Sequence, residues 1–146
     1  MPNYTLLSIP AAYITAVVPH VYAVELIKRA NNGRWANANA QGSAFKSHLQ
    51  RTIPAPTLAK FERAESAHRN GLENLPLFAA AVLAAAHAGV EPAAVAWTAW
   101  AFCGLRVVYN GIYIHVSDNK VSFARSAVWV VGVLLCFSLF VRAALA

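Results

Sequence analysis

Polar and ionisable side chains recur along one face of a predicted helix between residues 61 and 73. Four of them are spaced by four, three and four residues: Glu62, Ser66, Arg69 and Glu73. This spacing places them on the same side of an α-helix, with Asn70 at the edge of that face. The guanidinium and the amide of such a face could bind an anionic group of a small molecule.

Two other predicted helices present polar side chains of a related kind. Arg106, Tyr109 and Tyr113 are three and four residues apart and therefore share one helical face. Arg125 and Ser126 lie near the start of the last apolar segment. Ionisable groups inside membrane helices are costly and usually face the interior of a bundle or a cavity. These residues are therefore candidates for one shared polar site.

The arginines in these segments outnumber the carboxylates that could neutralise them. The cations are Arg29, Arg69, Arg106 and Arg125, and the acids are Glu62 and Glu73. A surplus of guanidinium groups beside a cavity that water reaches is what an anionic ligand requires. The sequence therefore predicts a site for a small, polar anion. The alternative is an internal ion-pair network, for example between Glu73 and Arg106, that fixes the register of the helices.

The composition of the chain indicates the elements that must position these residues. Its 146 residues are 58% hydrophobic and 12% charged, with a mean hydropathy of +0.46, whereas soluble proteins are about 25% charged. This composition excludes disorder and favours a small polytopic membrane protein. The net charge of +6 does not indicate nucleic-acid binding, because most of the cations flank apolar runs and none is interleaved with stacking aromatic residues on a polar face.

Four segments are long and apolar enough to be membrane helices, each needing about 20 residues to cross the hydrocarbon core. They cover residues 6–27, 61–90, 93–116 and 123–146, the second beginning with a polar half. The sequence therefore predicts an all-α fold, a single domain over residues 1–146. We expect a four-transmembrane-helix bundle with up-down topology and a partly ordered loop over residues 28–60.

Lysine and arginine in the short connections predict the orientation of this multi-pass bundle. Six of these residues lie in the connection after the first helix, and Lys120 lies before the fourth. The N-terminal tail has none, and the connection between the second and third helices has only Glu91 as a charged residue. Both basic connections are therefore expected to face the cytosol, with both termini on the opposite side of the membrane.

The histidines and cysteines do not indicate a metal site. His20, His48, His87 and His115 have no metal-ligand spacing and are interpreted as capping or interfacial residues, and His68 is interpreted as a packing residue. Cys103 and Cys136 both lie within apolar runs, as buried thiols do. No metal is predicted.

The polar motif of the second segment resembles that of a known membrane-protein family. Residues 62–76, ERAESAHRNGLENLP, are similar to the second-helix signature of the MAPEG family, the membrane-associated proteins in eicosanoid and glutathione metabolism. Arg106, Tyr109 and Tyr113 match its third-helix pattern, and Arg125-Ser126 match the start of its fourth helix. Within the family, the second-helix motif is closest to that of the microsomal prostaglandin E synthases.

This resemblance implies a homotrimer that binds glutathione between neighbouring subunits near the cytosolic side. By correspondence with the family motifs, the residues that would hold the tripeptide are Arg69, Asn70, Glu73, Tyr109 and Tyr113, together with Arg29 of the adjacent subunit. Arg125 would stabilise the glutathione thiolate, and Ser126 could donate a second hydrogen bond to the sulfur. The implied activity is that of a transferase or isomerase acting on a lipophilic electrophile in the membrane lipid.

The sequence departs from the prostaglandin E synthases at several positions. A second-helix arginine is Ser66 here, a first-loop aspartate corresponds to Ala40, a third-helix histidine to Tyr109 and a fourth-helix tyrosine to Trp129. These changes are expected to affect prostaglandin isomerisation more than glutathione binding.

Two other functions fit the same sequence. One is a non-catalytic lipid-presenting protein like the lipoxygenase-activating protein, and the other is a related enzyme that tailors a natural product without consuming glutathione. The implied location is the endoplasmic reticulum membrane in a eukaryote or the inner membrane in a bacterium.

Overall fold

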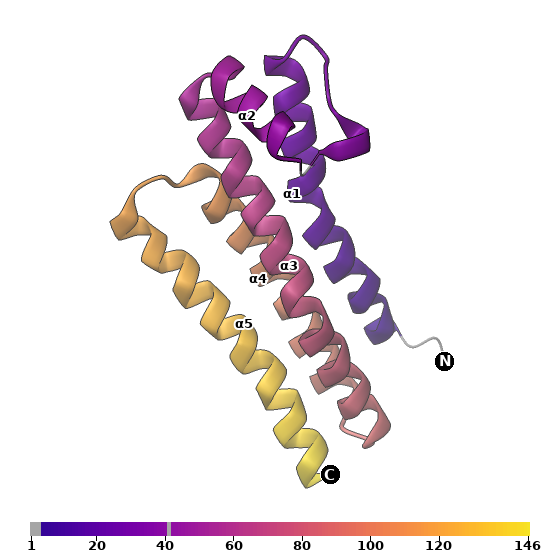
Figure 1. Cartoon of the computed structure of the whole chain (residues 1–146). Coiled ribbons are helices and arrows are strands. Elements are labelled where there is room, and N and C mark those ends of the chain that lie inside the picture. The colour runs from indigo at the N-terminus through magenta and orange to yellow at the C-terminus, as the bar shows by residue number, and fades with distance from the viewer. Residues whose placement is uncertain (1–3, 41) are drawn as a thin grey trace.

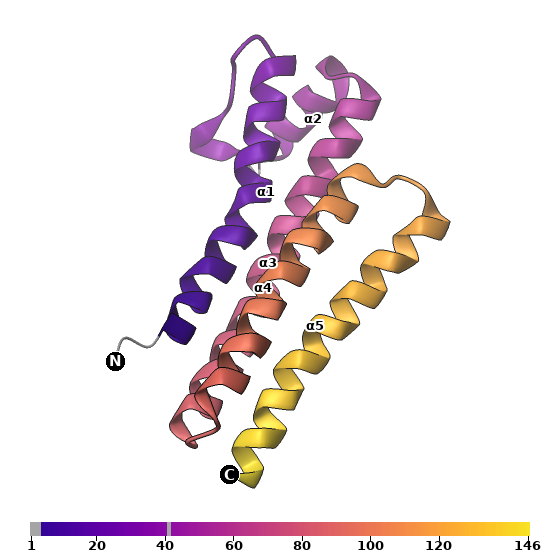
Figure 2. The same ribbon diagram turned by 180° about the vertical axis from the view of Figure 1, so that it is seen from behind.

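Four long helices lie side by side in the computed structural model, which describes residues 4–40 and 42–146 (Figures 1 and 2). Residues 1–3 and 41 of the expected single domain lie outside this description. The elements are η1 (Tyr4–Leu7), α1 (Ser8–Ala30), η2 (Asn37–Asn39), α2 (Ser43–Thr52), α3 (Ala55–His87), α4 (Pro92–His115) and α5 (Asn119–Leu145). The described residues are all-helical, with no strand among them. The long helices alternate in direction, so the amino- and carboxyl-terminal ends lie at the same end of the bundle.

The connection over residues 28–60 is more ordered than the sequence predicted. It contains η2 and α2, and α3 begins at Ala55 rather than near residue 61. The cause is a small apolar cluster at this end of the bundle, in which Leu49 and Ile53 are buried against Ile27 and Phe45 packs alongside. A helix as short as α2 depends on such packing because its intrinsic stability in water is marginal.

The core between α3, α4 and α5 consists of small side chains around a pair of stacked rings. Phe78 and Phe102 are stacked, with centroids 4.2 Å apart and an interplanar angle of 7°. Gly71 of α3 faces Ala16 of α1 so closely that a Cβ at position 71 would lie 2.7 Å from the Ala16 Cβ. This close approach brings α1 against the polar part of α3.

Pro19 lies inside α1, and side chains from two neighbouring helices bind the carbonyl groups around it. Proline has no backbone N–H, so the carbonyl group of Thr15 loses its usual helical partner. Asn110 Nδ2 of α4 donates to that carbonyl oxygen at 2.9 Å, and His68 Nδ1 of α3 donates to the next one, that of Ala16, at 2.8 Å. These contacts join α1 to α3 and α4.

The outer surface of the bundle is apolar. Two helical stretches of the described chain, Tyr4–Ala30 and Phe123–Leu145, are long and apolar enough to cross a membrane. Large apolar side chains such as Trp97 and Phe123 are 79% and 75% exposed. A surface of this kind suits contact with lipid or with other subunits.

Candidate functional site

A recess of about 180 Å³ lies where α3, α4 and α5 meet. It is lined by Asn70 of α3, by Tyr109 and Tyr113 of α4, and by Arg125, Ser126 and Trp129 of α5. Five of the eight residues that the family resemblance assigns to the glutathione site therefore surround one space. Trp129, which corresponds to a fourth-helix tyrosine of the prostaglandin E synthases, also lines it.

Two guanidinium groups and two phenol rings form a continuous series of contacts beside this recess. The Arg125 Cζ lies 4.1 Å from the centre of the Tyr113 ring, and the Arg106 Cζ lies 4.3 Å from the centre of the Tyr109 ring. The two tyrosine rings meet edge to face, with centroids 5.5 Å apart. Cation–π contacts favour this arrangement, and they leave the positive charge of each arginine uncancelled by a carboxylate.

Arg106 is the most deeply placed cation of this group, with 6% of its surface exposed. Its Nη2 donates a hydrogen bond to Asn70 Oδ1 at 3.0 Å. The ion pair between Glu73 and Arg106 suggested by the sequence is absent from the described part of the chain, where Glu73 is exposed. Arg106 therefore orients Asn70 and Tyr109, a positioning role that the sequence spacing alone did not indicate.

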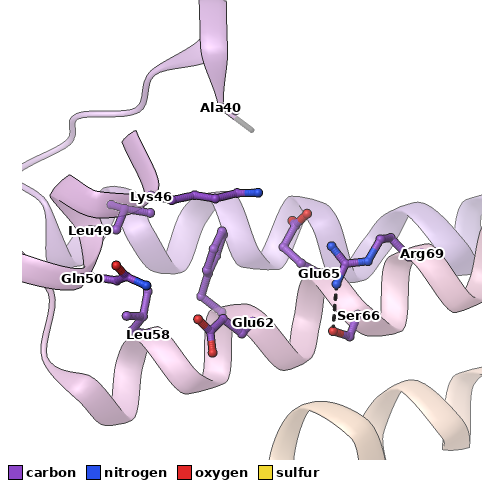
Figure 3. A pocket seen from close by; sticks show the side chains of 10 residues that line it. Ala40, Lys46, Leu49, Gln50, Leu58, Glu62, Glu65, Ser66 and Arg69 are labelled. Carbon is purple, nitrogen blue, oxygen red and sulfur yellow. Dashed lines mark hydrogen bonds between the residues drawn. The ribbon is translucent and has the colours of Figure 1, made fainter. Parts of the chain in front are cut away.

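Arg69 opens onto a different cavity from its neighbour Asn70. This cavity has a volume of about 330 Å³ and lies between α3 and the segment that contains α2, with Lys46, Glu62, Glu65 and Ser66 among its lining residues (Figure 3). Arg69 Nη2 donates to Ser66 Oγ at 3.1 Å. The polar face predicted on α3 therefore serves two cavities, because successive residues of a helix point in directions about 100° apart.

Arg29 lies away from the recess, at the exposed end of α1. Its Nε donates to Glu25 Oε1 at 2.7 Å, and both side chains are more than half exposed. In a single chain, Arg29 is therefore not part of the site that Arg125 lines.

A partly buried pair of side chains between α1 and α3 was not predicted from the sequence. Glu65 is 6% exposed, and His20 Nδ1 lies 2.7 Å from Glu65 Oε1. The expected capping role of His20 is wrong, since this residue lies inside α1 and its imidazole binds a buried carboxylate on α3. The ring of His68 lies 5.0 Å from that of His20. The register of α1 against α3 creates this cluster, and the spacing within one helix does not reveal it.

The whole chain was also compared with known proteins. A sequence model of the MAPEG family matches residues 6–145. The chain belongs to the MAPEG family. No curated protein and no solved structure gives a significant match. The family match does not separate the branches of the MAPEG family, so the likeness to the prostaglandin E synthases stays a prediction.

MAPEG proteins are helical membrane proteins, and this chain with its two apolar helices is an integral membrane protein. Members of the family generally use glutathione, and the family includes both transferases or isomerases and proteins without enzymatic activity. Membership is therefore consistent with a glutathione-dependent enzyme and with a lipid-presenting protein. The side chains that line the recess provide the evidence for choosing between these two functions.

Proposed function

We propose that this MAPEG protein is a glutathione-dependent transferase or isomerase that acts on a lipophilic electrophile. In this proposal the four long helices all span the membrane, three copies of the chain assemble, and glutathione lies between neighbouring subunits near the cytosolic face. The membrane is that of the endoplasmic reticulum in a eukaryote or the inner membrane in a bacterium.

The observation that supports this proposal most directly is the recess beside Arg125. Among the described residues, its lining includes a guanidinium, a serine hydroxyl, two phenol groups and an amide, but no carboxylate. In the described residues, neither Arg125 nor Arg106 forms an ion pair with an acid of the same chain. Burying positive charge without such a partner is unfavourable, and an anionic ligand would offset that cost.

The residues present fit the functional groups of glutathione. The tripeptide has two carboxylates, an ammonium group and a thiol. Guanidinium groups form paired hydrogen bonds with carboxylates, and Arg69 or the neighbouring subunit's copy of Arg29 could bind them. Glu73 and Glu62 are exposed on α3 and are suited to the ammonium group. Tyrosine hydroxyls add neutral donors.

Arg125 is proposed to act on the thiol. When bound, glutathione supplies a sulfur nucleophile that reacts as the thiolate, and a free thiol has a pKa of about 8.5. A guanidinium beside the sulfur lowers that pKa, and about 2.7 kcal/mol of selective stabilisation brings it near neutrality. Tyr113 holds the Arg125 guanidinium against its ring, and Ser126 lines the same recess.

The test is the rate at which purified protein in detergent conjugates glutathione to a generic electrophile, measured as a function of pH. We expect Arg125→Ala to slow conjugation at neutral pH at least about tenfold, because less of the thiol is ionised. The same substitution should move the rising limb of the pH profile upwards. Raising the pH should then recover much of the lost rate.

Arg142→Ala is the matched control, because Arg142 is an exposed arginine near the other end of α5. It should leave both the rate and the pH profile unchanged. Equal rates for the unaltered protein and for Arg125→Ala would refute the role of Arg125. An unaltered protein that binds glutathione but conjugates nothing would favour the lipid-presenting function instead.

A further inference from the structure

The stretch from the end of α1 to the start of α3 carries positive charge and contains no acid of its own. Residues 28–60, termed here the basic segment, contain six lysines and arginines and no aspartate or glutamate: Lys28, Arg29, Arg34, Lys46, Arg51 and Lys60. Only Arg29 of these pairs with a carboxylate in the described residues, and that carboxylate is Glu25 of α1. The charge of this segment is therefore available to an outside partner.

Packing within the basic segment directs its apolar groups inwards. Leu49 and Ile53 are 1% and 5% exposed in the cluster with Ile27. Trp35 meets Phe45 edge to face, with ring centroids 5.3 Å apart. The apolar face of α2 is thus already occupied by the bundle, and α2 cannot insert that face elsewhere without unpacking.

The cations of the basic segment remain on the outside. Lys28, Arg34, Lys46 and Arg51 are all exposed, and α2 lies at one end of the bundle, close to the end of α1 and the start of α3 (Figure 1). Arg51 Nε bonds the carbonyl oxygen of Ser47, which holds this guanidinium along the helix. The segment therefore presents a positively charged surface at that end.

We infer that the basic segment binds the headgroups of anionic phospholipids in the leaflet that it faces. Both ends of the segment continue into long helices, and α1 belongs to a stretch apolar enough to cross a membrane. The cations are therefore held near the headgroups, within the roughly 8 Å over which charges interact at physiological salt. This inference rests on the membrane arrangement proposed above, but not on the glutathione chemistry.

A lipid partner is favoured over a soluble polyanion by the tethering of the segment. A surface fixed at both ends to membrane helices meets headgroups at high local concentration, whereas a soluble partner must be captured from solution. The basic segment also lacks the pattern of cations interleaved with exposed aromatic side chains that stacking on nucleic-acid bases requires, since Trp35 and Phe45 pack against each other.

The experiment measures which lipid lies next to the protein. The full chain is reconstituted into phosphatidylcholine vesicles with pyrene-labelled phosphatidylglycerol or pyrene-labelled phosphatidylcholine, and energy transfer from tryptophan reports the enrichment of each probe. We expect phosphatidylglycerol to be enriched, by about fivefold for each cation that contacts a headgroup. Added salt should reduce this preference, because it screens exposed charges.

Substitutions that each remove one positive charge distinguish the basic segment from a general charge effect. Arg51→Gln should lower the phosphatidylglycerol preference, and Lys46→Gln should act in the same direction. Arg142→Gln should not. Arg142 is an exposed arginine in the last turn of α5, and that end of α5 lies at the opposite end of the bundle from α2 (Figure 1). Equal losses for Arg51→Gln and Arg142→Gln would overturn the inference.

Further outcomes separate the inference from the proposals on which it rests. Equal energy transfer to both probes, or a preference that salt does not change, would overturn the lipid site alone, and neither measurement needs a variant that folds. An absence of transfer to either probe would overturn it together with the membrane arrangement. Capture of a soluble oligonucleotide by the reconstituted protein, without a phosphatidylglycerol preference, would overturn the choice of partner.

Discussion

At the scale of single residues, the recess is distinguished by cations whose partners are neutral. Arg106 and Arg125 contact the faces of Tyr109 and Tyr113, and Arg106 also binds the amide oxygen of Asn70. Hydrogen bonds and aromatic faces reduce the cost of desolvating a guanidinium without removing its charge. The positive potential of the site therefore persists beside the space that a ligand would enter.

Arg69 tests whether the two cavities on either side of α3 belong to one binding site. Glutathione should raise the melting temperature of the purified protein, because binding to the folded state adds a stabilisation of RT ln(1 + c/Kd), where c is the concentration of free glutathione. We expect Arg69→Ala to reduce this stabilisation, because a carboxylate of the peptide would lose its guanidinium. A differential scanning measurement over a glutathione titration gives the change.

Lys46→Ala is the comparison for Arg69, since Lys46 lines the same cavity from α2. It should reduce the stabilisation less than Arg69→Ala does, because Lys46 does not belong to the second-helix motif. If Arg69→Ala leaves the glutathione titration unchanged, the peptide is confined to the recess of Arg125 and the larger cavity has another role.

Sequence spacing indicated many of the residues that meet at the recess, because each helix carries its polar residues on one face. It could not indicate that Asn70 and Arg69 open onto different cavities, since that depends on how α2 and α5 lie against α3. The pair of His20 and Glu65 was missed for the same reason. Contacts between helices follow from their register, which the pattern of one helix does not contain.

At the scale of helices, the long apolar runs were predictable and the short amphipathic helix was not. Hydrophobic length identifies α1, α4 and α5 because a membrane helix needs a long run of apolar residues. The polar composition of residues 28–60 conceals α2, which is stabilised by a few apolar contacts such as that of Leu49. The start of α3 at Ala55 was missed because Pro56, which the sequence assigned to the loop, is favoured in the first turn of a helix.

Pro19 and Asn110 provide a test of how α1 is joined to α4. We expect Asn110→Leu to destabilise the protein by about 1 kcal/mol, because the buried carbonyl oxygen of Thr15 loses its donor. In a Pro19→Ala background the backbone N–H of residue 19 can bond the same oxygen, so the substitution should cost close to nothing. Unfolding in a denaturing detergent, followed by circular dichroism, measures both values.

Comparing Asn110→Leu in the two backgrounds isolates the contact between Asn110 and the Thr15 carbonyl group. The loss of the proline ring is common to both proteins that carry Pro19→Ala, so its effect on stability cancels. Asn110→Leu also removes the unpaired Asn110 Oδ1 in both backgrounds, so this effect cancels as well. If Asn110→Leu destabilises the two backgrounds by the same amount, the side chain does not replace the missing N–H of Pro19 and its contact with Thr15 is incidental.

At the scale of the whole molecule, the position of Arg29 makes the assembly testable. Arg29 lies away from the recess of its own chain, and the proposed trimer would place it in a neighbour's site. Arg29→Ala and Arg125→Ala should each lower conjugation. Co-expression of the two variants should restore activity, because random mixing gives roughly a quarter of the sites both intact arginines.

The control for this complementation is a mixture of the two variants purified separately and kept as separate assemblies. That mixture should stay as inactive as its components. Recovery only after co-expression supports a site shared between subunits. Failure to recover activity in co-expressed assemblies that contain both chains would place Arg29 and Arg125 in the same subunit's site or remove Arg29 from the site.

The amide group of Asn70 favours one direction for a peptide bound in the recess. Its Oδ1 accepts hydrogen bonds from Arg106 Nη2 and Asn74 Nδ2, so Nδ2 is the atom that it can offer to a guest. At Asn70 the recess therefore offers an amide N–H donor, which favours a carboxylate over an amine. A zwitterionic tripeptide would be polarised along α3, with an acidic terminus towards Asn70 and its amino terminus towards the glutamates outside the recess.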